Sequence, residues 1–205
     1  MDRWHPPQHL AVGAQADQLV LCAGSDGAFQ MNEWSFSQLC GLARVSKDTV
    51  NRLSPDTVTK VFGETMPSGQ KPMQLLTSGE SLRSIHGVSY TRLWNLDLVN
   101  VLREFATDFT PPQEAVTGGT GLYAGEQDMF AFLIDPTGWT EIDGQTFAPG
   151  LFAWNSEVGK RSIGVSTFWF QAVCQNHIVW TQPRSWRSLA NTRPACMTRS
   201  ATCGK

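Results

Sequence analysis

The stretch that decides the fold is residues 151–180, LFAWNSEVGKRSIGVSTFWFQAVCQNHIVW. Residues 151–154 form an apolar run, and 162–170 mix apolar side chains with small polar ones, a pattern typical of paired strands in a sheet. The residues between these runs, 157–160 (EVGK), include a glycine. The pattern therefore predicts two paired β-strands joined by a short turn. Residues 173–180 either continue a strand or begin a helix.

Further strands are expected on the amino-terminal side of this stretch. Residues 128–135 (DMFAFLID) form an apolar run that ends at a proline, and 139–143 form a short strand that ends at an Asp-Gly turn. Residues 19–21, 73–76 and 82–90 are expected to form further strands, and 93–105 carry apolar side chains at helical spacing. Five or more strands with one flanking helix predict an α+β fold with a largely antiparallel sheet.

Residues 33–63 are predicted to be helical. Ser35 or Ser37 can cap a first helix, Ser46 a second and Ser54, followed by a proline, a third. Within this segment, 39–53 resemble a helix-turn-helix, in which the second helix would contact DNA. The residues then expected to face DNA are Lys47, Thr49, Asn51 and Arg52. The alternative is a helical hairpin packed on the sheet, because Arg44 occupies the turn position where glycine is usual.

Composition favours one globular domain. The chain has 205 residues, of which 41% are hydrophobic and 17% charged, enough apolar content for a core. We expect a single α+β domain over 1–182, with a helical module at about 33–63 and a sheet core at about 73–180. No run approaches the roughly 18 apolar residues of a membrane span, and the first residues lack an apolar signal segment. A cytoplasmic protein without a membrane partner is therefore expected.

Residues 183–205 differ from the rest of the chain. They contain five basic residues, no acidic ones and two cysteines, without apolar periodicity. We expect an irregular basic tail that is not native, as a frameshift would produce. Charge is also uneven: 1–157 contain all 18 acidic groups and 9 basic ones, a net −9, whereas 158–205 carry +7. A basic end can meet phosphate; the alternative is a solvated tail.

No residue pattern indicates catalysis, a metal site or a cofactor. The five cysteines form no CxxC pair and the four histidines no metal-binding spacing. A Cys174–His177 nucleophile pair would need 173–180 to be helical, because strand residues three apart point to opposite faces. Several polar residues lie beside the apolar strands. They either hydrogen-bond to one another and fix the sheet register, or they line a binding groove. These residues are Asn155, Glu157, Gln175, Asn176 and His177.

The blocks FAFLIDPTGW (130–139), residues 151–180 and WSFSQLCGLARVSKDTVNRLSPDTV (34–58) resemble domain-of-unknown-function family 932, the phage/plasmid-like proteins. LRSIHGVSYTRLWNLDL (82–98) and LREFATDFTPPQ (102–113) fit the same family, so that the resemblance covers roughly 17–180. It implies a mobile-element setting and brings no established activity and no catalytic residues. Members of the family continue with a helical segment where this chain has its basic tail.

Three classes of function stay open from the sequence. The first is a non-enzymatic nucleic-acid protein that binds DNA or anneals single strands, with a homo-oligomer as a further expectation. Sheet proteins of this kind use basic and aromatic side chains, here Lys160, Arg161, Arg83, Arg92 and Trp169. The second is a nuclease or a Cys/His hydrolase. The third is a protein–protein adaptor in phage–host conflict.

Overall fold

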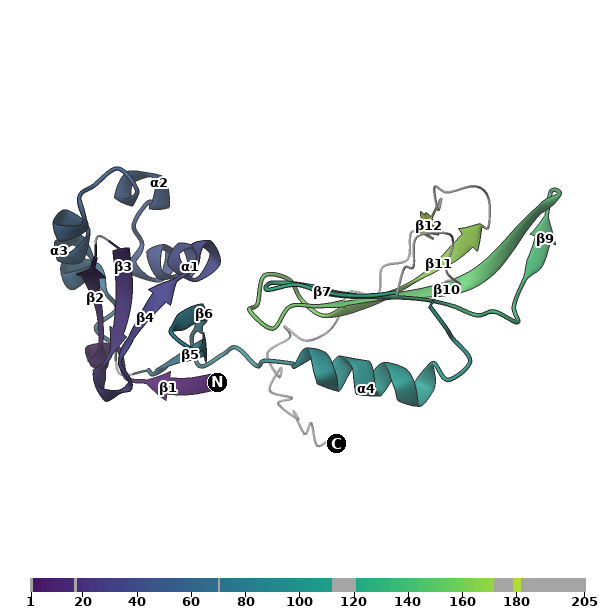
Figure 1. Ribbon diagram of the computed structural model, residues 1–205, viewed down its shortest axis with the longest axis horizontal. Helices are drawn as coiled ribbons and strands as arrows, with labels where there is room; N and C mark the ends of the chain where they lie inside the picture. The colour runs from purple at the N-terminus through teal and green to yellow at the C-terminus, as the bar shows by residue number, and fades with distance from the viewer. Residues whose placement is uncertain (1, 17, 70, 112–120, 172–178, 182–205) are drawn as a thin grey trace, which may run out of the picture. The chain divides into compact units, whose positions relative to one another are not determined.

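The computed structural model describes residues 2–16, 18–69, 71–111, 121–171 and 179–181. The chain divides into two compact units (Figure 1). Unit 1 contains Met1–Arg92 together with Glu157–Gly159, and unit 2 contains Leu93–Ser156 and the chain from Lys160 onward. The sequence predicted one domain over 1–182. That the two units together form a single domain stays a prediction.

Unit 1 is framed by a six-stranded sheet in the order β1-β5-β6-β4-β3-β2. Every neighbouring pair is antiparallel except β4 and β6. The sequence predicted three of these strands and missed β1, β2 and β4. The elements are β1 (Asp2–His5), the 3-10 helix η1 (Pro7–His9), β2 (Leu10–Gln15), β3 (Gln18–Ala23), the 3-10 helix η2 (Gly24–Asp26), β4 (Ala28–Met31), β5 (Met73–Ser78) and β6 (Ser81–His86).

Three helices connect β4 to β5: α1 (Glu33–Ala43), α2 (Lys47–Val50) and α3 (Pro55–Thr65). Ser46 and Ser54 cap α2 and α3 as predicted, each accepting a hydrogen bond from a backbone N–H three residues on. The predicted cap of α1 is wrong, because the side chain of Asn32 accepts from the backbone N–H of Ser35. Four strands precede α1, and its buried residues share one core with the sheet. The helices therefore belong to a mixed αβ unit.

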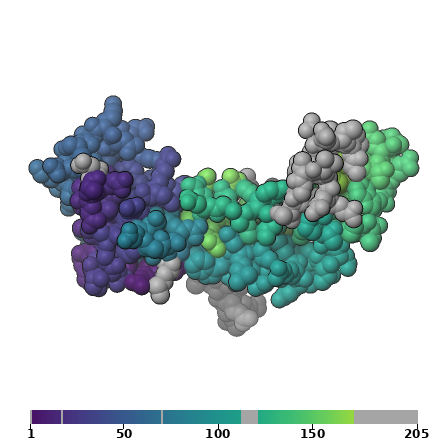
Figure 2. All heavy atoms as spheres, viewed as in Figure 1, coloured from purple at the N-terminus to yellow at the C-terminus, as the bar shows by residue number. Residues whose placement is uncertain are grey.

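Unit 2 contains the sheet that the opening stretch predicted. Its path is β12-β11-β10-β8-β7, with β9 also paired to β10, and all pairs are antiparallel. The β9–β10 hairpin reaches the surface, green in Figure 2, and all three residues of β9 are exposed. The elements are α4 (Asn95–Phe105), β7 (Leu122–Ala124), β8 (Met129–Ile134), β9 (Thr140–Ile142), β10 (Gln145–Asn155), β11 (Gly164–Gln171) and β12 (Val179–Thr181).

Helix α4 covers one face of this second sheet. Leu98 and Leu102 of the helix are buried against β8 and β10, in a cluster that includes Met129, Ala131 and Ala153. The side chains of the same strands that have the opposite parity form the other face. The prediction of a mixed α+β fold with antiparallel strands is confirmed. In the described part of the chain no helix has the length and apolar character needed to cross a membrane.

Candidate functional site

Aromatic side chains gather on the face of the unit 2 sheet that α4 does not cover. Strand register places Phe130 opposite Trp154 and Phe132 opposite Phe152. Tyr123 of β7 lies opposite Phe130 and is 57% exposed. The other four are half-buried. This aromatic face therefore comprises Tyr123, Phe130, Phe132, Phe152 and Trp154, contributed by three adjacent strands.

The rings of the aromatic face contact one another. The centroids of Phe130 and Phe152 are 5.8 Å apart with nearly parallel planes, and those of Phe152 and Trp154 are 5.5 Å apart. Such pairs hold their rings in fixed orientations. Farther along the sheet the aromatic rings on this face are inaccessible, because Phe168 and Phe170 are buried and Phe170 packs against Trp139. The accessible rings thus lie toward the β7 edge.

Two cations lie beside the accessible rings. The Arg161 guanidinium carbon is 5.3 Å from the centroid of the Phe130 ring, within the range of a cation–π interaction. Arg161 Nε and Lys160 Nζ both approach the carboxylate of Asp128, at 2.9 Å and 3.5 Å. Tyr123, Phe130, Asp128 and Lys160 line one open hollow of about 690 Å³. Aromatic rings and positive charge therefore meet at one accessible place.

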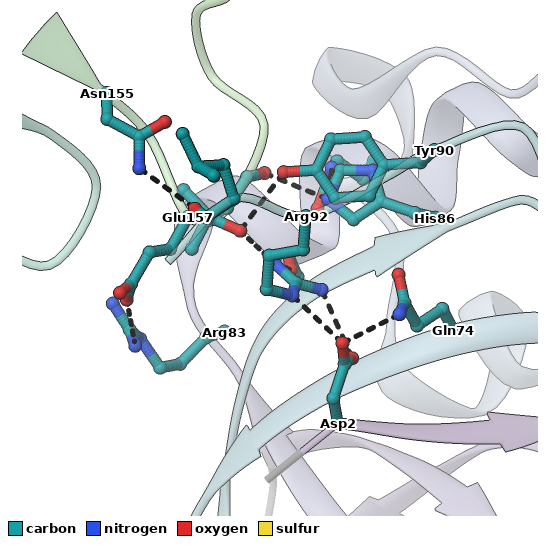
Figure 3. Close-up of polar contacts among 12 residues, drawn as sticks. Asp2, Gln74, Arg83, His86, Tyr90, Arg92, Asn155 and Glu157 are labelled. Carbon is teal, nitrogen blue, oxygen red and sulfur yellow. Dashed lines mark hydrogen bonds and ion pairs between the residues drawn. The ribbon is translucent and has the colours of Figure 1, made fainter. Parts of the chain in front are cut away.

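A second group of polar residues, the enclosed cluster, lies in unit 1 around the buried Arg92 side chain and contains Asp2, His86, Tyr90 and Arg92 (Figure 3). Arg92, whose side chain is 2% exposed, holds both carboxylate oxygens of Asp2 at 3.1 and 3.2 Å. Arg92 and the Tyr90 hydroxyl also donate to the backbone carbonyl of Glu157. The groups that define this cluster bond to one another and to backbone, so that it serves to hold 157–159 in unit 1.

His86 belongs to the same enclosed cluster. Its Nε2 lies 3.0 Å from the carbonyl of Val158, and its ring stacks on Tyr90 at 3.6 Å. Burial, together with the charge of Arg92, lowers the pKa of His86 to about 4. The carbonyl of Val158 also accepts from the indole of Trp34 at 2.8 Å. A neutral His86 is thus the form that suits the folded unit.

The pKa of His86 leads to a testable pH dependence. Because this pKa is lowered in the folded state, the unfolded chain binds the proton first as pH falls below about 6.5. Stability that is present above pH 6.5 should therefore be lost progressively down to about pH 4. Urea unfolding at several pH values measures this loss, and His86→Gln should flatten the profile. Exposed His9 gives the control: His9→Gln should keep the wild-type profile, and equal profiles for all three proteins would contradict the assignment.

The four residues of the helical segment that were predicted to contact DNA belong to unit 1, whereas the aromatic face belongs to unit 2. Lys47 Nζ bonds to Glu33 at 3.0 Å, and Arg52 Nε donates to the backbone carbonyl of Asp48. The Thr49 backbone N–H donates to the cap Ser46. Asn51 and Lys47 line an open hollow of about 600 Å³ in unit 1.

The other predicted contacts divide between the two units. In unit 1, Arg83 pairs with Glu157 at 3.4 Å, and Arg92 is buried as described. In unit 2, Lys160 and Arg161 do lie beside aromatic rings. Trp169 does not belong to the aromatic face. Phe168 lies opposite Gly150 and shares the face of Phe152, so that the next residue along β11, Trp169, points to the other face. The sequence singled out Trp169 and missed Phe130 and Trp154, although their i, i+2 spacing with other aromatics was a signal.

The polar group beside the strands is only partly described. Asn155 Nδ2 donates to the carbonyl of Leu93 and to Asn95 Oδ1, both at 2.9 Å, so that it ties β10 to the start of α4. Gln175, Asn176 and His177 lie outside the described residues, as does the Cys174–His177 pair. Among the described residues no cluster of three or more His, Cys, Asp or Glu side chains could hold a metal ion.

Comparison of the chain with family models, with curated proteins and with solved structures finds no match. The resemblance to family 932 therefore stays a prediction.

Proposed function

We propose that this chain binds single-stranded nucleic acid, without catalysis, on the aromatic face of unit 2. The observation that carries the proposal is the meeting of accessible rings with Lys160 and Arg161 on one antiparallel sheet backed by a helix. Aromatic side chains stack on nucleic-acid bases of any sequence, and each stacked base contributes roughly 1–3 kcal/mol of binding free energy. The family resemblance implies a mobile-element setting and supports a role in phage or plasmid maintenance. Strand annealing is proposed because the antiparallel sheet carries basic and aromatic side chains.

Single strands fit this surface better than a duplex does. Stacking on a protein ring requires a base whose own face is free, and the bases of a duplex are stacked on each other. The cations are few, and 1–157 carry a net charge of −9. Binding should therefore depend on stacking more than on phosphate contacts. Two phosphate contacts give a slope of log K against log salt of only about −1.4 for a single strand.

The direct test is fluorescence anisotropy of a labelled thymidine oligonucleotide of about 20 nucleotides, longer than the roughly 4–16 nucleotides that one OB-fold covers. We expect binding at about 50 mM salt, where phosphate contacts are strong, with a shallow salt dependence. Unlabelled single strand should displace the probe and duplex of the same length should not. The oligonucleotide should stay intact during incubation. No binding at this salt concentration, or equal displacement by duplex, would sink the proposal.

Tyr123 provides the sharpest variant, because it is exposed and lies at the edge of the sheet. Tyr123→Ala should weaken binding of the oligonucleotide roughly tenfold, the loss of one stacked base at about 1.4 kcal/mol. Trp4→Ala is the matched control, since Trp4 is an aromatic residue of unit 1 with 49% exposure. It should bind within about twofold of the wild type. Equal losses in the two variants would show that Tyr123 has no special role.

The helix-turn-helix interpretation of 33–63 remains a weaker proposal. Helix α2, which would read DNA, has only four residues, and the ammonium of Lys47 is held by Glu33. Its support is the left-handed turn at Arg44 (φ 57°) between α1 and α2. Binding of duplex that is lost in Asn51→Ala and unaffected by Tyr123→Ala would favour it over the single-strand proposal.

A further inference from the structure

We infer that a backbone phosphate of the bound strand replaces the Asp128 carboxylate as the partner of Lys160 and Arg161, so that Asp128 competes with the ligand for these two cations in the free protein. This inference rests on the proposed function of the aromatic face. Asp128 gives one oxygen to each of two cations, Oδ1 to Arg161 and Oδ2 to Lys160. A phosphate presents the same kind of paired anionic oxygens.

The position of this carboxylate matches what a stacked strand requires. Asp128 lines the same hollow as Tyr123 and Phe130, and the Arg161 guanidinium lies over the Phe130 ring. A base on these rings would bring its own phosphate close to Lys160 and Arg161. Lys160 and Arg161 are 39% and 49% exposed, whereas Asp128 is 15% exposed. The two cations are therefore more accessible to a ligand than the carboxylate is.

The segment that carries the cations is itself held in place. The Lys160 backbone N–H donates to Ser156 Oγ at 3.0 Å, and Ser156 Oγ donates to the carbonyl of Gln127 at 2.5 Å. This link joins the residue before Asp128 to the residue that bears the ammonium group. Phosphate binding can consequently draw the two side chains away from Asp128 without rebuilding the backbone. Ion pairs whose cations are partly exposed contribute little to stability, so that Lys160 and Arg161 can exchange one anionic partner for another.

Removing the competitor should strengthen binding. In the anisotropy assay with the thymidine oligonucleotide, Asp128→Asn should raise affinity roughly three- to tenfold at about 50 mM salt, the sum of two exposed ion pairs. The gain should shrink at higher salt. Asp135→Asn is the matched control, because Asp135 follows the other end of β8 and its Oδ1 accepts from the Thr137 backbone N–H and hydroxyl. It should bind within about twofold of the wild type, since screening weakens charges more than roughly 10 Å away.

A second variant keeps the inference testable if Asp128→Asn fails to fold, which a thermal melt would reveal. Arg161→Gln should weaken binding and reduce the magnitude of the salt slope by about 0.7, the loss of one phosphate contact. If the wild type binds while Asp128→Asn binds no tighter, or while Arg161→Gln leaves the slope unchanged, the inference fails and the proposed function stands. If the wild type does not bind at all, both fail.

Discussion

Replacing Arg92 by alanine is expected to lower the free energy of unfolding by roughly 3–5 kcal/mol, the usual result of breaking a buried ion pair from one side. The guanidinium is enclosed and reaches three partners: the Asp2 carboxylate, the Ser84 hydroxyl and the carbonyl of Glu157. Alanine supplies no donor to any of them. Urea unfolding followed by tryptophan fluorescence at neutral pH measures the loss.

Arg83 offers a matched control for this experiment. It pairs with the side chain of Glu157 in the same unit, at 3.4 Å, and its side chain is 26% exposed. Arg83→Ala should cost no more than about 1 kcal/mol, as partly exposed pairs do. If Arg92→Ala costs as little as Arg83→Ala, the enclosed cluster does not stabilise unit 1. Arg92 would then again be a candidate for contact with a ligand.

The parts of the fold that were predictable from sequence are those with local signals. Ser54 before a proline fixed the start of α3, and the apolar run between two aspartates fixed β8 to within one residue at each end. Strand β1 had no such signal. It is four residues long, and its partner β5 lies about seventy positions away along the chain, so that only tertiary pairing makes it a strand.

The two cations of the candidate site were predictable from the sequence, whereas its aromatic side chains were not. Lys160 and Arg161 stand out in the sequence because they lie at the turn between two predicted strands. The choice among aromatic residues depends on parity, and parity depends on the register between β10 and β11. Phe152 lies opposite Ser166, and this pairing places Phe168 and not Trp169 on the aromatic side of the sheet. A single sequence does not supply that register.

Glycines on the same face lead to the second large effect. An ideal Cβ at Gly150 would overlap the ring of Phe168, and one at Gly164 would overlap the indole of Trp154. Across the β10–β11 pair, Gly150 lies directly opposite Phe168, and Gly164 lies directly opposite Trp154. Gly150→Ala should therefore lower the free energy of unfolding by roughly 1–3 kcal/mol, because the buried Phe168 ring has to move. Urea unfolding measures the change.

A control of opposite sign and a compensating variant make this prediction specific. Gly63 lies inside α3, where an added Cβ meets nothing within 4 Å, so that Gly63→Ala should raise stability by about 0.5–1 kcal/mol. If overlap with the ring is the cause at Gly150, the alanine should cost less when Phe168 is already leucine. An equal cost in both backgrounds would mean that the backbone of β10, and not the Phe168 ring, requires glycine at this position.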